Sequence, residues 1–170
     1  MPKEIWTYLG SQLGFSETGR IILYQHIVPR IRDIGLNVFE PFTECAKGVD
    51  FNKANAFPLY EDRVKFWKGF NEKLGGVNKL GMKKSQIMSP VLDGGPVLDD
   101  GVANEIGHYA AKRYGKIIAL RTDFRLSENL GALINPQIES DIFETGGKIC
   151  RAMDDWYSEL AEEYGRLQGL

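Results

Sequence analysis

The strongest constraint on the fold is an alternation of short apolar segments with longer helical ones. β-branched and aromatic residues cluster in short runs that predict buried strands, which are residues 4–10, 36–42, 86–93, 116–123 and 139–143. Helical periodicity occupies most of the chain between them. Alternating strands and helices form a parallel sheet covered by helices on both faces. The sequence therefore predicts an α/β fold with a doubly wound, mainly parallel sheet of about five strands.

Helices are expected over four segments, which are residues 16–35, 59–84, 101–115 and 148–167. Pro29 is expected to kink or break the first helix because it lacks an amide proton, and the sequence Leu-Gly-Gly at 74–76 is expected to interrupt the second. The last helix is amphipathic, and its apolar face comprises Ile149, Met153, Trp156, Leu160, Tyr164 and Leu167. Residues 43–58 show no clear period and are expected to form a loop.

Composition and charge exclude several classes of protein. A chain of 170 residues is expected to form a single domain over 1–170. Its net charge of −2 gives no basic face for nucleic acid. No secretory signal is expected from residues 1–10, and no apolar run reaches the ~18 residues of a membrane span. Cys45 and Cys150 are expected to be reduced thiols, and the protein to be cytoplasmic.

The glycine-rich segments lack the motifs of common cofactors. Residues 10–14 contain two glycines but no dinucleotide fingerprint and no phosphate-loop lysine. The acids at 93–101 lack the spacing of a calcium loop and its bidentate glutamate. No metal and no cofactor is therefore expected.

The topology indicates where a ligand would bind. In a flavodoxin-like sheet of order 2-1-3-4-5, connections diverge to opposite faces between the first and third strands, and ligands bind beyond their carboxyl ends. The segments that leave those strands are residues 8–17 and 91–105, both rich in glycine and longer than minimal turns. The stretch LDDGVANEIG at 98–107 therefore lies at the rim of the expected pocket.

Three carboxylates in this stretch suit glycosidic chemistry. Glu105 falls near the first turn of the helix 101–115, where free amides and the helix dipole favour an ionised carboxylate by ~0.3–1 kcal/mol. An ionised carboxylate in a concave site can attack a glycosidic carbon while a second acid assists the leaving group. Asp99 and Asp100 are adjacent, so one of them is expected to face Glu105. The alternative is that these acids only cap the helix.

The same stretch resembles a known family. Asp99-x-Gly101-x-Ala103-x-Glu105-Ile-Gly is similar to the D-x-G-[TSV]-A-x-E-[IL]-G segment of the nucleoside 2-deoxyribosyltransferases, and follows a strand that ends at Leu92-Asp93-Gly94. Further segments resemble that family in the same order along about 130 residues, namely YLGSQLGFSETGR (8–20), VFEPF (38–42), GKIIALRTDFR (115–125) and LINPQ (133–137).

The resemblance implies base exchange by double displacement. Glu105 would attack C1′ of a 2′-deoxynucleoside, and a second nucleobase would then attack the deoxyribosyl-enzyme ester. Asp99 would be the partner acid, and Tyr8 would lie near the sugar. Further substrate contacts are expected at Phe15, which would stack on the base, and at Asp93, Gly101 and Asn135. Asn135 would reach a sugar in a neighbouring subunit, so the resemblance implies a closed homo-oligomer with shared active sites.

Departures from the pattern keep alternatives open. Asn78 stands where some relatives carry an aspartate, and an amide cannot supply a proton as an acid can. Proton transfer would then depend on Asp99, Asp93 or water. An N-glycosidase that hydrolyses nucleosides or nucleoside 5′-monophosphates would use the same carboxylates, with candidate phosphate ligands at Ser11, Ser16 and Arg20. A non-enzymatic receiver-like domain would need acids after the first strand, where this chain has Tyr-Leu-Gly-Ser-Gln.

Overall fold

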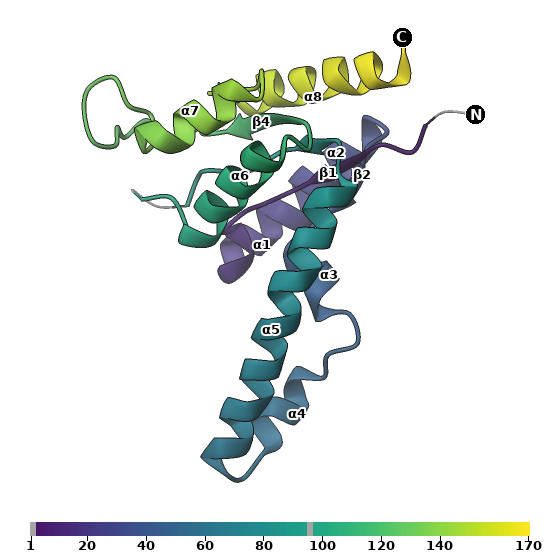
Figure 1. The fold of residues 1–170 in the computed structure, drawn as a ribbon, viewed down its shortest axis with the longest axis vertical. Coiled ribbons are helices and arrows are strands. Elements are labelled where there is room, and N and C mark those ends of the chain that lie inside the picture. The colour runs from purple at the N-terminus through teal and green to yellow at the C-terminus, as the bar shows by residue number, and fades with distance from the viewer. Residues whose placement is uncertain (1–2, 95–96) are drawn as a thin grey trace.

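The computed structural model describes residues 3–94 and 97–170 and shows one parallel sheet between two layers of helices (Figure 1). The strands are β1 (Trp6–Tyr8), β2 (Asn37–Phe39), β3 (Ile87–Met88), β4 (Lys116–Leu120) and β5 (Lys148–Cys150). Their order is β2-β1-β3-β4-β5, and all four pairings are parallel. The predicted flavodoxin-like order 2-1-3-4-5 is confirmed.

Alternation along the strands divides the core into two halves. In β4, Ile118 and Leu120 face one side of the sheet, whereas Ile117 and Ala119 face the other, as the period of two requires. The first side packs against the π-helical turn η2 (Leu23–Ile27), α2 (Val28–Asp33) and α8 (Met153–Gln168). The second packs against α5 (Tyr60–Lys84), α6 (Asp100–Lys112) and α7 (Pro136–Glu144).

The helix expected over 16–35 is divided, as Pro29 predicts. It consists of α1 (Glu17–Ile22), η2 and α2, and Pro29 lies in the first turn of α2. Ser16 caps α1, since its hydroxyl accepts a hydrogen bond from the Gly19 amide at 3.0 Å. The wider π-helical turn directly precedes the proline, where a regular α-helix would lose a hydrogen bond.

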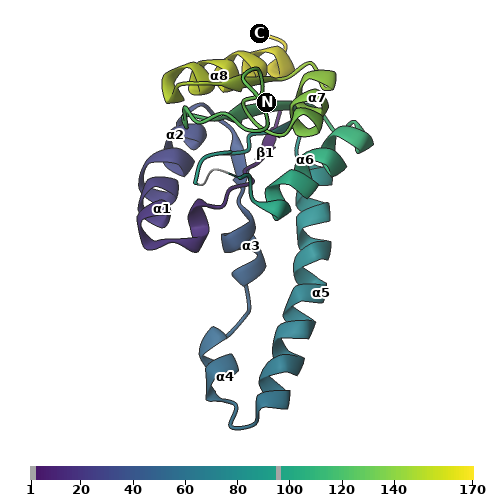
Figure 2. The same cartoon turned by 90° about the vertical axis from the view of Figure 1, so that its left-hand side faces the viewer.

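The segment between β2 and β3 departs most from expectation. Residues 43–58 are not a loop, because they contain most of α3 (Pro41–Ala46) and all of α4 (Phe51–Ala56). Glu40 and Asp50 cap these helices with their carboxylates. Residues 74–76 do not interrupt α5, which runs unbroken for 25 residues. Together, α4 and the N-terminal half of α5 project from the sheet as an arm (Figures 1 and 2).

Two further expectations at the C-terminal end are wrong. Residues 139–143 lie in α7, which begins with an Asn135 cap and Pro136, and the fifth strand is β5 instead. The last helix consequently begins at Met153, and Ile149 belongs to β5 and packs on the opposite side of the sheet. The rest of its predicted apolar face does pack against the first half of the core, through Met153, Trp156, Leu160, Tyr164 and Leu167.

The connections place a ligand site at one edge of the sheet. After β1 the chain passes to η2 and α2 on one face, and after β3 it passes to α6 on the other. The carboxyl ends of β1 and β3 therefore form the point where connections diverge. In the described part of the chain, no helix is long and apolar enough to cross a membrane.

Candidate active site

A cavity of about 470 Å³ lies at the carboxyl ends of β1 and β3. Its walls come from the loop after β1, from α1 and η2, from α3, from the middle of α5 and from the first turns of α6. Most of its lining is apolar, with few polar groups, as in sites that bind small organic molecules. The cavity is large enough for a nucleoside-sized ligand.

Glu105 lies at the floor of this cavity. Tyr8 Oη donates a hydrogen bond to Glu105 Oε1 at 2.5 Å, and Asn78 Nδ2 donates to the same oxygen at 3.1 Å. Among the described residues, Glu105 Oε2 has no hydrogen-bond donor. One oxygen is therefore held by two donors, while the other has none among the described residues.

The position of Oε2 explains the glycine that follows β1. A Cβ built on Gly10 would lie 2.9 Å from Glu105 Oε2 and 3.6 Å from Met88 Cε. Only glycine leaves the space beside this oxygen open. Sequence inspection singled out the neighbouring residues but not Gly10.

Burial sets the protonation of the site. It raises the pKa of Glu105 from its ordinary 4.5 to about 7; the hydrogen bond from Tyr8 opposes this rise, the charge of Asp99 adds to it, and the Asn78 amide opposes it. Burial and the Glu105 carboxylate raise the pKa of Tyr8 far above its usual range, so its hydroxyl stays a donor. The Tyr8 ring is fully buried and stacked on Phe39 at 5.5 Å between centroids.

The raised pKa predicts a pH-dependent gain of stability for Glu105→Gln. The folded protein binds the Glu105 proton more tightly than the unfolded chain, so its stability falls as pH rises from about 4.5 to about 7. Glutamine does not ionise, so we expect the variant to be about 3 kcal/mol more stable than wild type at pH 8 and nearly equal at pH 4.

Urea unfolding at both pH values measures this difference. Glu162→Gln, on the exposed face of α8, is the matched control because its carboxylate is in solvent. A gain of equal size at pH 4 and pH 8 would contradict the raised pKa of Glu105.

Asp99 has a double function in the site. It is the N-cap of α6, where its Oδ1 accepts a hydrogen bond from the Val102 amide at 3.0 Å. The prediction that these acids cap the helix is therefore correct for Asp99. The same side chain lines the cavity, and its Oδ2 has no protein donor among the described residues. Gly101 also lines the cavity, and a Cβ built on it would lie 3.0 Å from Asp99 Oδ1, which is a tight contact.

Aromatic side chains form the outer wall. Phe15 is 72% exposed and contacts Phe42 edge to face, with the ring centroids 4.8 Å apart. Gly14 allows this arrangement, since a Cβ there would lie 2.2 Å from the Phe42 ring. The exposed Phe15 ring offers an apolar face of the kind on which flat rings stack, and its expected contact with a base stays a prediction. Phe42 was not identified from the sequence, although it follows the carboxyl end of β2.

Glu40 fixes the α3 wall. Its buried carboxylate accepts hydrogen bonds from the Phe42 and Thr43 amides, both at 2.9 Å, and from Tyr24 Oη at 2.9 Å. The last contact ties α3 to η2, the π-helical turn, across the cavity. Cys45 of α3 and Arg20 of α1 also line the cavity. The Cys45 side chain is buried and its thiol is not in a disulfide.

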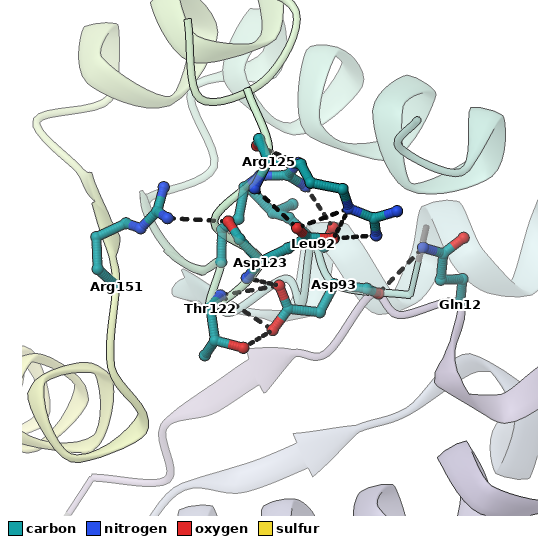
Figure 3. Close-up of polar contacts among 8 residues, drawn as sticks. Gln12, Leu92, Asp93, Thr122, Asp123, Arg125 and Arg151 are labelled. Atoms are coloured by element: carbon teal, nitrogen blue, oxygen red, sulfur yellow. Dashed lines mark hydrogen bonds and ion pairs between the residues drawn. The ribbon is translucent and has the colours of Figure 1, made fainter. Parts of the chain in front are cut away.

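Asp93 does not line this cavity, and its expected contact with a substrate stays a prediction. Its carboxylate accepts hydrogen bonds from the Thr122 amide and hydroxyl, at 2.8 and 2.7 Å, and from the Asp123 amide at 2.9 Å (Figure 3). Arg125 pairs with Asp123 in the same loop. Asp93 therefore anchors the loop after β4.

Asn135 also lies apart from the cavity of its own chain. It caps α7 by accepting from the Gln137 amide at 3.0 Å and donates to Glu128 at 2.5 Å. Its expected role toward a neighbouring subunit stays a prediction. His108 packs edge to face on Tyr114 and does not line the cavity.

The fold is shared with solved deoxyribosyltransferases. A 2-deoxyribosyltransferase from Leishmania mexicana superposes with a TM-score of 0.61 at 15% identity, covering 93% of this chain and 97% of that one. A 2-deoxyribosyltransferase from Bacillus psychrosaccharolyticus gives 0.54 at 18% identity, with coverage of 91% and 95%. No known protein-family model and no curated protein matches the sequence. The resemblance seen in the motifs thus extends to the whole fold.

Proposed function

We propose that this protein transfers a 2-deoxyribosyl group between nucleobases through a covalent ester on Glu105. The observation that carries the proposal is the Glu105 carboxylate itself, held through Oε1 by Tyr8 and Asn78 with Oε2 free. Its place in an apolar cavity beside Asp99 adds support. The deoxyribosyltransferase fold of the solved neighbours agrees with this chemistry.

The proposed reaction has two displacements at one carbon. Glu105 Oε2 forms a bond to C1′ as the C1′–N bond to the first base breaks, and the electron pair of that bond leaves with the base. Asp99 Oδ2, or water, supplies the proton that the leaving base requires. A nitrogen of the second base then attacks C1′ from the side opposite the ester, the C1′–Oε2 bond breaks and releases the carboxylate, and the N–H proton of that base passes to Asp99 Oδ2 or water. Two inversions retain the configuration at C1′.

Base exchange is tested directly by chromatography of 2′-deoxyinosine with and without adenine. The proposal expects deoxyadenosine and hypoxanthine when adenine is present. Hypoxanthine and free deoxyribose in equal amounts, whether or not adenine is added, would overturn transfer. We also propose that the ligands are 2′-deoxynucleosides and free nucleobases. We propose further that the protein is a homo-oligomer in which Asn135 completes the site of a neighbouring subunit.

Gly10→Ala is expected to lower kcat/KM for exchange by about 10- to 100-fold, because the new Cβ displaces the attacking oxygen. Steady-state kinetics with deoxyinosine and adenine measure the loss, and thermal unfolding checks the fold. Gly165→Ala is the matched control, since a Cβ there meets nothing within 4 Å. Equal losses in the two variants would contradict the position assigned to Oε2.

Arg20 favours a second candidate, hydrolysis of nucleoside 5′-monophosphates. Its cationic side chain lines the cavity from α1, and Ser11 lines it from the loop after β1. These groups are of the kind that binds phosphate. Release of hypoxanthine from deoxyinosine 5′-monophosphate without an acceptor base, and its loss in Arg20→Ala, would establish this activity. The proposed transferase instead prefers deoxyinosine and keeps that preference in Arg20→Ala.

A further inference from the structure

Cys45 is linked to Glu105 through Asn78. The Cys45 Sγ lies 3.2 Å from Asn78 Oδ1, and Asn78 Nδ2 lies 3.1 Å from Glu105 Oε1. The three side chains come from α3, α5 and α6, and all line the cavity. A change at the thiol therefore has a direct structural route to the carboxylate.

The Cys45 thiol and an ionised Glu105 carboxylate favour one direction for these two hydrogen bonds. Burial, together with the charges of Glu40, Glu105 and Glu44, raises the pKa of the Cys45 thiol to about 11, so the thiol remains a donor at neutral pH. An ionised Glu105 accepts only. With Glu105 ionised, the reverse orientation of the Asn78 amide would set its oxygen against the carboxylate and would leave the Cys45 sulfur to act only as a weak acceptor. Cys45 and Glu105 thus select the same amide orientation.

We propose that Cys45 is a positioning residue whose thiol holds the Asn78 amide with Nδ2 directed at Glu105 Oε1, which leaves Oε2 free beside Gly10. The effect of Cys45 on catalysis rests on the proposed role of Glu105 as nucleophile. Its effect on the pKa of Glu105 does not, because an N–H donor favours the ionised form of a carboxylate whatever reaction that carboxylate takes part in.

The pKa of Glu105 responds to Tyr8 of β1 and Asp99 at the start of α6, besides the Asn78 amide. The other titratable or charged side chains in the cavity lining are Cys45 of α3, Arg20 of α1 and Tyr24 of η2. Of the two donors to Glu105 Oε1, the Tyr8 hydroxyl is held by a fully buried ring. The Asn78 amide is oriented by Cys45. Loss of the thiol donor therefore weakens one of the two bonds that favour the ionised form.

Cys45→Thr and Cys45→Val form a matched pair for the test, because they share a shape and differ in the hydroxyl donor. Isotope-edited infrared spectroscopy, with Glu105→Gln as the subtraction reference, follows the Glu105 carboxylate through a pH titration. We expect the pKa of Glu105 to rise by about half a unit in Cys45→Val and to stay near the wild-type value in Cys45→Thr. Equal pKa values in the two variants would overturn the proposal.

The Asn78→Ala background shows whether Cys45 acts through Asn78. There the Val and Thr variants are expected to give the same pKa for Glu105, since the coupling between the two positions is lost. A difference that persists without Asn78 would assign Cys45 a direct effect and overturn the proposal. If the branched variants fail to fold by thermal unfolding, Cys45→Ser and Cys45→Ala supply the same contrast.

These titrations need no turnover, so they separate this proposal from the proposed function. A wild-type enzyme that exchanges no bases would disprove the function and leave the pKa shifts as expected. If the enzyme exchanges bases, we expect the acid limb of its pH–rate profile to move to higher pH in Cys45→Val and to return to the wild-type position in Cys45→Thr. A role for Cys45 as pocket wall alone would change KM for the base and leave that limb in place.

Discussion

Glu105→Gln is expected to lower kcat for base exchange by at least ~10⁴-fold, because an amide oxygen is a poor nucleophile toward C1′. Glutamine keeps the size of the side chain and a carbonyl that accepts from Tyr8 and Asn78. The variant is expected to fold, with the stability gain described above. Loss of activity would therefore report chemistry rather than unfolding.

Asp100→Asn is the control for this loss. Asp100 is an exposed acid in the first turn of α6, five residues before Glu105, and it does not line the cavity. We expect it to keep near wild-type exchange in the chromatographic assay. An active Glu105→Gln enzyme, or an equally inactive Asp100→Asn enzyme, would remove the basis for naming Glu105 the nucleophile.

Asp99→Asn is expected to give the second largest effect, a loss of about 10²- to 10⁴-fold in kcat. Asparagine retains the cap of α6, since its side-chain oxygen also accepts from the Val102 amide. It supplies no proton to a leaving base. The loss should therefore be greatest for donors whose base is poorly stabilised as an anion, and smaller for an activated leaving base.

Asp99→Ala separates the two functions of this residue. This change removes both the acid and the helix cap. We therefore expect a kcat similar to that of Asp99→Asn, and a free energy of unfolding about 1 kcal/mol lower than that of Asp99→Asn. Kinetics combined with urea unfolding of both variants give the comparison. Full activity in Asp99→Asn would assign the proton transfer to water and exclude Asp99 as the donor.

The sheet was predictable because its signals are local. Each strand from β1 to β4 lies within an expected apolar run, and the alternation with helices predicted a parallel, doubly wound sheet. The flavodoxin-like order then placed the expected ligand site at the carboxyl ends of β1 and β3. Glu105, Asp99 and Tyr8 follow from this topology and the motif, since all three lie near the carboxyl ends of β1 and β3. Short elements were harder to predict. Residues 139–143 end in the strand-favouring pair Ile142-Phe143, but they belong to the helix that starts at Asn135-Pro136.

The Glu40 and Asp50 caps were local sequence signals for α3 and α4, but the polar composition of 43–58 obscured them.

Other parts of the site depend on contacts between residues far apart in the sequence. Asp93 resembles a site residue in sequence, but its partners in the structure are Thr122 and Asp123, about 30 residues further along. No local pattern indicates such a partner.

The Cys45–Asn78 contact likewise joins residues 33 apart on two different helices. Asn78 was recognised as a departure from an acidic position, and its contact with Glu105 became visible only when α5 was placed beside α6. The sequence therefore located the site, and the structure defined how its carboxylate is held.

The central claim, a deoxyribosyl ester on Glu105, is tested most directly by mass spectrometry of acid-quenched enzyme. After incubation with deoxyinosine alone, we predict that the peptide containing Glu105 gains the mass of one deoxyribosyl group. The gain should disappear when adenine is added before quenching, and should not occur in Glu105→Gln. Turnover with no adduct on that peptide, or an adduct on another residue, would contradict the account.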